Sequence, residues 1–337
     1  MPSHVSQRPR VVTRRRRPEL RILLALLVVG GLVLWGLRDT APVSHFADRP
    51  GRDAFSALYA EAMTALPAPE RTLDLRTAYG VVRVYRFRGA NDGSPPLLLL
   101  PGTSSSTPLW ADNLPSLLRE RSVYTVDLLG EPGLSLPDSP IPERADQAAW
   151  LAEVIGQLPE PRLHLLGLSI GGWTATNLLV QQPEVARSGK IISLTLVEPV
   201  FVLATISAEA VLRSIPASVP WLPKPWRDSF LSWSAGGAPI DDSVVAALIE
   251  QGMQSYRMRL PAPVRITEDE LRGLGLPVLV VLAERSPMHD SAAAAEVARR
   301  TRPDDVVTVY PDATHAINGE HPDRLAADVG RFVGAQD

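Results

Sequence analysis

From residue 71 onward, short apolar segments alternate with amphipathic ones along the chain. Residues 72–77 and 81–88 flank a Tyr79-Gly80 turn and predict a β-hairpin. Continuous apolar runs predict buried strands at 96–100, 123–127, 163–168, 191–197, 276–282 and 306–310. Helical patterns between them lie at 110–120, 147–158, 172–182, 291–300 and 322–333. This order predicts an α/β fold with a mostly parallel sheet and helices on both faces.

Two stretches depart from the alternation. Residues 199–272 contain no clear strand, many prolines and helix-like patches such as 244–253. We interpret them as a helical cap inserted over the carboxyl ends of the strands, where ligands bind in such sheets; an ordinary surface excursion is the alternative. Residues 38–70 include prolines at 42, 50, 67 and 69 and predict a linker with one short helix near 54–66. The main domain is then expected at 71–337.

The N-terminal 37 residues have the pattern of a membrane anchor, a basic tail followed by an apolar run. Residues 22–37 are apolar and uncharged, and as a helix they would cover about 24 Å of a bilayer core of about 30 Å. Arg21 and Arg38 could reach the two interfaces. The arginine-rich tail at 1–21 predicts a cytoplasmic N-terminus and an extracytoplasmic body. We therefore expect a single-pass anchor in the cell membrane, in contact with membrane lipid; a cleaved signal peptide and a peripheral helix are alternatives.

Composition narrows the classes of function. The chain has 337 residues, 45% of them hydrophobic, which suffices for a full core. It has no cysteine, so disulfides, thiolate catalysis and Cys-based zinc sites are excluded. Its net charge is −3 although seven arginines lie in the first 21 residues, so the remainder is acidic and is not expected to bind nucleic acid.

The strand at 163–168 leads directly into a candidate nucleophile. Residues 167–171 read Gly-Leu-Ser-Ile-Gly and are followed by a helical segment. This pattern predicts a strand, a sharp turn that exposes Ser169, and a helix. Such a turn strains the backbone, and Gly167 and Gly171 meet the need for small neighbours. The free N–H groups at the start of the helix can stabilise developing negative charge.

Four features resemble the α/β-hydrolase fold over roughly residues 70–335. They are the Ser169 turn, the Leu-Pro-Gly-Thr loop at 100–103, the Asp-Leu-Leu-Gly-Glu-Pro-Gly-Leu-Ser segment at 127–135, and Ala-Thr-His at 313–315. Their order and spacing fit that family. The resemblance implies a serine hydrolase, esterase-like and capped by helices, that cleaves carboxylic esters of small molecules through an acyl-enzyme on Ser169.

The resemblance also assigns roles around Ser169. A serine needs a base, and the family order Ser, acid, His makes His315, after the last strand, that base. The N–H groups of Ile170 and Thr103 are expected to bind the oxyanion. The triad acid stays open, because Ser286 stands where an aspartate is common. Glu198 after the strand at 191–197 is favoured, and Glu284 and Asp290 are the alternatives.

Other chemistries have less support. No His-Glu-x-x-His motif occurs, so no metal is expected, and no Gly-x-Gly-x-x-Gly follows a strand, so no dinucleotide cofactor is expected. Within the same fold, a thioesterase, a C–C hydrolase, a peptidase or a perhydrolase remains open. A member that binds a ligand without catalysis is a further alternative, motivated by the irregular acid position.

Overall fold

A sheet of nine strands runs through the described part of the chain, which in this computed structural model is residues 39–217, 222, 224–237 and 243–337. The spatial order is β11-β10-β8-β7-β4-β5-β3-β2, and β6 pairs with β3. The pairs from β11 to β5 are parallel, whereas β3 is antiparallel to β2, β5 and β6. The strands are β2 (Arg71–Thr77), β3 (Gly80–Phe87), β4 (Leu97–Leu100), β5 (Val123–Val126), β6 (Leu136–Pro137), β7 (Leu163–Leu168), β8 (Ile191–Val197), β10 (Val278–Ala283) and β11 (Val306–Tyr310). The expected mostly parallel sheet is confirmed.

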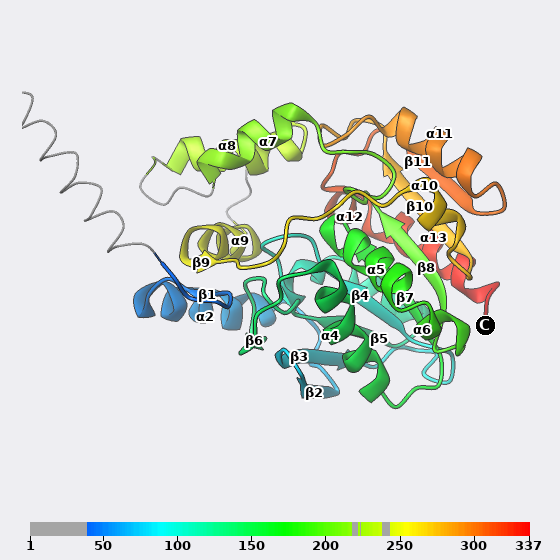
Figure 1. Ribbon diagram of the computed structural model, residues 1–337, viewed down its shortest axis with the longest axis horizontal. Helices are drawn as coiled ribbons and strands as arrows, with labels where there is room; N and C mark the ends of the chain where they lie inside the picture. Colours follow the sequence, from blue (N-terminus) through cyan, green and yellow to red (C-terminus); the bar gives the residue numbers. More distant parts are fainter. Residues whose placement is uncertain (1–38, 218–221, 223, 238–242) are drawn as a thin grey trace, which may run out of the picture. The chain divides into compact units, whose positions relative to one another are not determined.

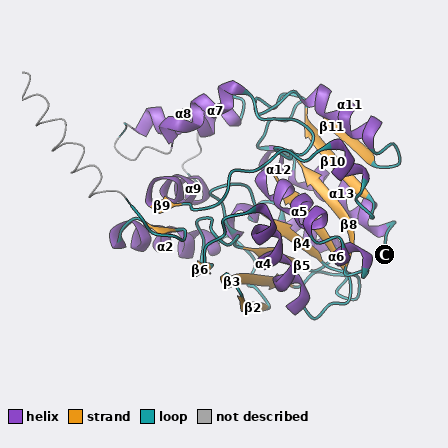
Figure 2. Cartoon of the chain, viewed as in Figure 1, coloured by secondary structure: helices purple, strands orange, loops and turns teal. Residues whose placement is uncertain are grey.

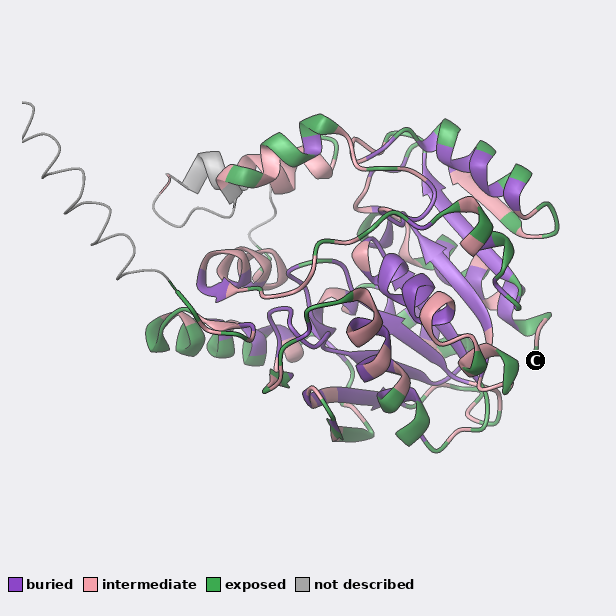
Figure 3. Ribbon diagram, in the orientation of Figure 1, coloured by how far each residue is buried: buried purple, intermediate pink, exposed green. Residues whose placement is uncertain are grey.

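Helices cover both faces of this sheet (Figures 1 and 2). Side chains alternate between the faces, so that in β4 Leu98 and Leu100 join one core cluster and Leu97 and Leu99 the other. The first cluster is closed by α4 (Arg144–Gln157), α5 (Ile170–Gln181), α10 (Glu268–Arg272) and α11 (Ser291–Thr301). The second is closed by α2 (Arg49–Met63), α3 (Leu114–Glu120) and α13 (Pro322–Gly334). Burial on both faces explains why the central strands are mainly apolar instead of alternating between polar and apolar residues (Figure 3).

Proline and capping side chains shift several helix boundaries from their expected positions. The helix expected at 110–120 is divided into a 3₁₀ turn, η1 (Thr107–Trp110), and α3. Pro115 lies in the first turn of α3, where its missing N–H is tolerated. Helix α4 begins at Arg144, three residues before the expected start, because Glu143 and Asp146 form a capping box there. The remaining short helices are α6 (Glu184–Arg187) and α12 (Ile317–Glu320).

The segment expected to be a linker is largely structured and packed. Helix α2 begins at Arg49, earlier than expected, and is capped by Asp48, whose carboxylate accepts a hydrogen bond from Gly51 N at 2.7 Å. Phe55 and Tyr59 on this helix are buried in the second core cluster. The periodicity of these apolar side chains predicts the helix, but their partners lie far away in sequence. Residues 42–70 therefore belong to the same unit as the sheet.

The interruption at 199–272 is mainly helical, as expected. It holds α7 (Ala208–Ala217), α8 (Lys224–Ser234) and α9 (Val244–Ser255), and α9 packs against α2. One strand was not expected there: β9 (Tyr256–Arg257) pairs antiparallel with β1 (His45–Phe46). A two-residue strand has no readable alternation, and its partner is about 210 residues away, so sequence patterning cannot detect it.

The membrane prediction concerns residues outside the described part of the chain. No helix among the described residues combines the length and the apolar character needed to span a bilayer. The basic tail at 1–21 and the expected anchor at 22–37 both lie outside the described residues.

Candidate active site

The candidate nucleophile occupies a strained turn between a strand and a helix. β7 ends at Leu168 and α5 begins at Ile170, and Ser169 between them has φ 53° and ψ −117°. Positive φ at a non-glycine residue costs about 1–3 kcal/mol and must be enforced by surrounding contacts. Part of that enforcement is a hydrogen bond of 3.0 Å from Ser169 N to Val197 O on the neighbouring strand. The serine is thus held at the carboxyl end of β7.

The two glycines of the motif are required by close backbone approaches. A Cβ at Gly167 would lie 2.3 Å from Gly171 O, and a Cβ at Gly171 would lie 2.3 Å from Leu100 O. Neither neighbour is a flexible side chain that could move aside. Any other residue would push α5 away from β4 and β7, and with it the serine.

Gly171→Ala is expected to lower the free energy of unfolding by about 1–3 kcal/mol, because the added methyl group overpacks a rigid backbone contact. Gly156→Ala in α4 is the matched control, since its Cβ would meet nothing within 4 Å. That change should raise the free energy of unfolding by about 0.5–1 kcal/mol through helix propensity. Urea denaturation monitored by circular dichroism measures both, and equal effects at the two positions would contradict the close approach.

Three side chains predicted from sequence meet at this turn. His315 Nε2 lies 3.0 Å from Ser169 Oγ, and His315 Nδ1 lies 3.0 Å from Glu198 Oε2. His315 belongs to the loop after β11. Glu320 steadies that loop by accepting hydrogen bonds from Thr314 N and Thr314 Oγ1, each at 2.7 Å. The arrangement lets the imidazole take a proton from the serine while the carboxylate orients the ring.

Glu198 is the carboxylate that the structure brings to His315. It follows β8, has φ 47° and is 0% exposed, and its Oε1 accepts a hydrogen bond of 2.6 Å from Ala283 N. Burial by itself would raise the pKa of Glu198, but hydrogen bonding to His315 and the other neighbouring donors bring it below its usual value. Ser286, at the position where an aspartate was expected, is one of those donors. Glu198 is therefore ionised at neutral pH.

The two alternative acids lie elsewhere. Glu284 is exposed, and Asp290 caps α11 by accepting a hydrogen bond of 2.9 Å from Ala293 N. His289 is buried near the candidate acid, with its Nε2 3.6 Å from Glu198 Oε2. Burial lowers the pKa of His289, so its ring is neutral beside the carboxylate. No group of three or more His, Asp or Glu side chains in the described ranges is arranged to hold a metal ion.

The expected oxyanion donors border the same cavity as Ser169. Ile170 is the first residue of α5, so its N–H has no partner within the helix. Thr103 belongs to the loop after β4, and a Cβ at its neighbour Gly102 would lie only 3.7 Å from Ser169 Cβ. Thr103, Ser169 and Ile170 all line one cavity. Two backbone donors at this place could stabilise an oxyanion formed on Ser169.

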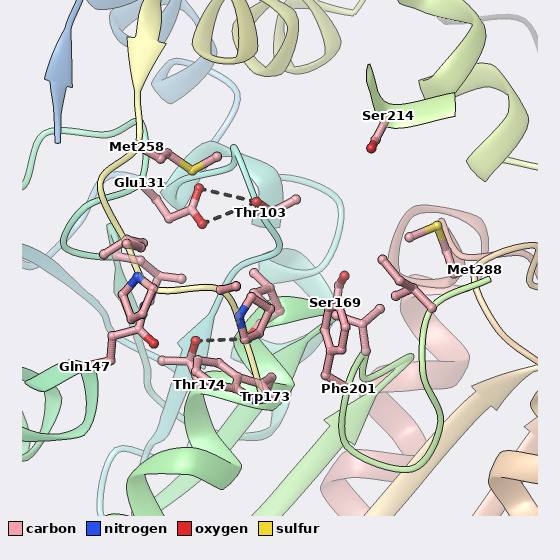
Figure 4. A pocket seen from close by; sticks show the side chains of 18 of the residues that line it. Thr103, Glu131, Gln147, Ser169, Trp173, Thr174, Phe201, Ser214, Met258 and Met288 are labelled. Atoms are coloured by element: carbon pink, nitrogen blue, oxygen red, sulfur yellow. Dashed lines mark hydrogen bonds between the residues drawn. The ribbon is translucent and has the colours of Figure 1, made fainter. Parts of the chain in front are cut away.

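Sequence reasoning did not single out Glu131, a buried carboxyl that holds the Thr103 loop. Its Oε2 accepts a hydrogen bond of 2.9 Å from Ser104 N, and its Oε1 accepts one of 3.3 Å from Thr103 Oγ1 (Figure 4). Ser104 has φ 54°, so the backbone of the loop is strained at the residue whose N–H donates to Glu131. Burial raises the pKa of Glu131 to about 7. The only signal in the sequence was an acid inside the 127–135 segment that resembles the family.

Glu131→Gln should remove a pH-dependent loss of stability. Between its usual pKa of 4.5 and about 7, the folded state holds a proton on Glu131 that the unfolded chain has released. The free energy of unfolding of the wild type therefore falls as pH rises through this window, by about 3 kcal/mol from this group. The free energy of unfolding of the variant minus that of the wild type is therefore expected to increase by that amount between pH 4.5 and pH 8, as measured by urea titrations. A difference that does not change with pH would contradict the raised pKa.

The cavity beside Ser169 has a volume of about 330 Å³ and a mainly apolar wall. Its lining comes from the loops after β4, β5, β8 and β10, from α4, α5, α7 and α8, and from residues 258 and 260–263. Because Ala210 and Ser214 on α7 and Phe230 on α8 line it together with Ser169, the helical insertion forms part of the wall. A cavity of this size accommodates a small organic molecule.

Comparison with known proteins finds a matching family model, similar carboxylesterases and a similar crystal structure. Residues 97–328 match the model of the alpha/beta hydrolase family. The chain is similar to the carboxylesterase nap of Bacillus subtilis strain 168, with 25% identity over 285 residues, covering 82% of this chain and 91% of the relative. It is also similar to carboxylesterase YbfK of the same strain, with 24% identity over 83% of this chain and 93% of the relative. The crystal structure of naproxen esterase from Bacillus subtilis superposes with a TM-score of 0.76 at 23% identity, over 85% of this chain and 99% of that chain.

Proposed function

Because the chain belongs to the alpha/beta hydrolase family, we propose that it is a serine hydrolase that cleaves carboxylic esters through an acyl-enzyme on Ser169. The observation that carries the proposal is the continuous chain of hydrogen bonds from Ser169 through His315 to Glu198. Ester hydrolysis rather than another reaction of the family is supported by the two carboxylesterases to which the chain is similar over most of its length.

The proposed reaction has two steps, acylation of Ser169 and hydrolysis of the acyl-enzyme, and His315 and Glu198 act in both. Ser169 Oγ attacks the ester carbonyl while His315 Nε2 accepts its proton, and Glu198 stabilises the imidazolium through Nδ1. The N–H groups of Ile170 and Thr103 bind the oxyanion of the tetrahedral intermediate. The intermediate collapses as His315 gives the proton to the leaving alkoxide, which departs as an alcohol. Water, activated by the same imidazole, then cleaves the acyl-enzyme and restores Ser169.

A fluorophosphonate probe tests the proposal directly. The folded protein should react at Ser169, identified by peptide mass spectrometry, and the labelled protein should lose its hydrolysis of a p-nitrophenyl ester in proportion to the labelling. Heat-denatured protein is the control, because without the fold the serine is not activated. Folded protein that neither reacts with the probe nor hydrolyses any ester of a broad panel would overturn the proposal.

We also propose that the protein is held in the cell membrane by residues 22–37, with the hydrolase domain outside the cytoplasm. The apolar run and the arginines before it support this proposal. Full-length protein should stay with the membrane fraction in alkaline carbonate, and a variant lacking residues 1–38 should be released. Release of the uncleaved full-length chain by carbonate would contradict the anchor.

A further inference from the structure

Glu131 is a buried carboxyl that touches the loop carrying one of the two expected oxyanion donors. It is 5% exposed and lines the same cavity as Thr103 and Ser169. Figure 4 shows its carboxyl group directed toward Thr103, whose Oγ1 lies 3.3 and 3.5 Å from the two carboxyl oxygens. The charge on Glu131 therefore acts close to the place where negative charge would develop on a substrate of Ser169.

The groups around Glu131 favour its neutral form. Its hydrogen-bond partners are Ser104 N and Thr103 Oγ1, both uncharged donors, and no Lys or Arg of the described ranges lines the cavity. An ionised carboxylate that is buried without a cationic partner is costly, so such a group keeps its proton to a higher pH. Burial accordingly raises the pKa of Glu131 to about 7, although the two hydrogen bonds act against this rise.

The titratable groups on the elements packed around Glu131 do not offset its burial. Burial and the charge of Glu131 raise the pKa of Tyr256 on β9, so this phenol stays neutral. Asp127, at the start of the same segment, is enclosed by its own hydrogen bonds from α2 and η1. Neither Asp127 nor the guanidinium groups of Arg257 and Arg259 beside the cavity wall contribute to the pKa of Glu131.

Both protonation states of Glu131 can hold the Thr103 loop, but one of them brings a charge. A neutral carboxyl group donates through its O–H and still accepts through its other oxygen. With the proton on Oε1, Oε2 keeps the hydrogen bond from Ser104 N, and Oε1 donates to Thr103 Oγ1. The ionised form accepts both hydrogen bonds and adds a negative charge beside the loop whose N–H group would bind the oxyanion. Repulsion between the two charges would raise the energy of the transition state.

We propose that Glu131 is a positioning residue that must be neutral to hold the Thr103 loop in its fully active form. The inference rests on the proposed function, because the oxyanion is the one formed when Ser169 attacks an ester. Glu198 works in the opposite state, since it is ionised and stabilises the imidazolium of His315. The site thus uses two buried carboxyl groups in different protonation states, each set by its surroundings.

Glutamine at position 131 imitates the neutral carboxyl group at every pH. Its amide oxygen can accept from Ser104 N and its NH₂ group can donate to Thr103 Oγ1, so the loop stays held without a charge. The ratio of kcat/KM for Glu131→Gln to kcat/KM for the wild type is expected to rise about 10-fold between pH 5.5 and pH 8.5. The midpoint of the rise should lie at about pH 7, because kcat/KM reports the titration of the free enzyme.

Hydrolysis of an uncharged ester measures this ratio. p-Nitrophenyl butyrate is suitable when the reaction is followed at the isosbestic wavelength of the released phenol, and groups that titrate in both proteins cancel in the ratio. Circular dichroism at each pH checks that the proteins are folded at the assay temperature. Glu284→Gln is the matched control, since it neutralises an exposed acid that does not line the cavity. Its ratio to the wild type should not change with pH.

Glu131→Leu separates the charge from the hydrogen bonds. It is neutral, like glutamine, but leaves Ser104 N without its acceptor at a residue of strained backbone. It should therefore lower kcat/KM about 10-fold relative to Glu131→Gln at every pH. The ratio between these two variants should not depend on pH, because neither side chain titrates.

Infrared spectroscopy detects the proton on Glu131 without any turnover. The difference spectrum of the wild type minus Glu131→Gln should contain the C=O band of a neutral carboxyl group at pH 5.5. At pH 8.5 it should contain the bands of a carboxylate instead. Carboxylate bands at both pH values would overturn the proposal.

The kinetic outcomes separate this inference from the function on which it rests. Fluorophosphonate labelling of Ser169 and ester hydrolysis, with a Glu131→Gln ratio that is constant or falls as pH rises, would overturn the role of Glu131 and leave the proposed function standing. Equal kcat/KM for Glu131→Leu and Glu131→Gln would overturn the hold of this side chain on the loop. No labelling and no ester hydrolysis by the wild type would instead overturn the proposed function, and this inference with it.

Discussion

Replacing Ser169 with alanine is expected to lower kcat for a carboxylic ester by about 10⁴-fold or more. The reason is that the nucleophile 3.0 Å from His315 Nε2 is removed, while the backbone donors and the cavity remain. Steady-state hydrolysis of a p-nitrophenyl ester measures the loss. Thermal unfolding checks that the variant is folded, and the substitution adds no atoms to the turn.

His315→Ala should cost a similar factor, and the double variant should lose little more. Nucleophile and base act as one unit, so their effects on kcat are far from additive. Two independent losses that multiply in the double variant would contradict this shared role, as would a Ser169→Ala variant with near wild-type kcat.

Glu198→Gln is expected to lower kcat by about 10⁴-fold, the second large effect. Glutamine has nearly the same shape and its oxygen can still accept the hydrogen bond from Ala283 N. Its amide cannot stabilise an imidazolium, and its NH₂ group would favour the wrong tautomer of His315. The loss should fall on kcat while KM changes little, because Glu198 is buried behind the imidazole and does not line the cavity.

The matched controls are the two other acids considered from the sequence. Glu284→Gln alters an exposed side chain, and Asp290→Asn keeps an oxygen that can still cap α11. Both variants should retain kcat within about twofold. A large loss in either, with Glu198→Gln active, would move the acid to that position and overturn the assignment made here.

Most of the sheet and its covering helices could be predicted from the sequence, because most of the parallel strands are mainly apolar runs of the right length. Leu97–Leu100 is the clearest example, since this strand is buried on both faces and all four of its residues are leucine. The packed helix α2 was read as part of a linker, because prolines dominate its surroundings and its partners are distant residues such as Asp127, which accepts a hydrogen bond of 2.9 Å from Tyr59 OH. The pairing of β1 with β9 was missed for the same reason.

Only some residues of the candidate active site could likewise be predicted from the sequence. Ser169 and His315 are carried by local motifs whose spacing is visible along the chain, and they lie 3.0 Å apart at Oγ and Nε2. The choice among three acids could not be made locally, since it depends on which strand end faces His315. Glu131 was not singled out, because the role of this carboxyl depends on its burial and on its contacts with the Thr103 loop, which the sequence does not show.

Ser169 and Glu198 directly follow the adjacent strands β7 and β8. Backbone contacts join the two strand ends, including the hydrogen bond from Ser169 N to Val197 O. His315 instead follows β11, which lies at one end of the sheet order. Local opening of that edge strand would withdraw the base from a nucleophile and an acid that stay in place. On gentle heating, the rate of ester hydrolysis is therefore expected to decrease while most of the secondary structure persists. The rate should recover on cooling, when β11 pairs with β10 again.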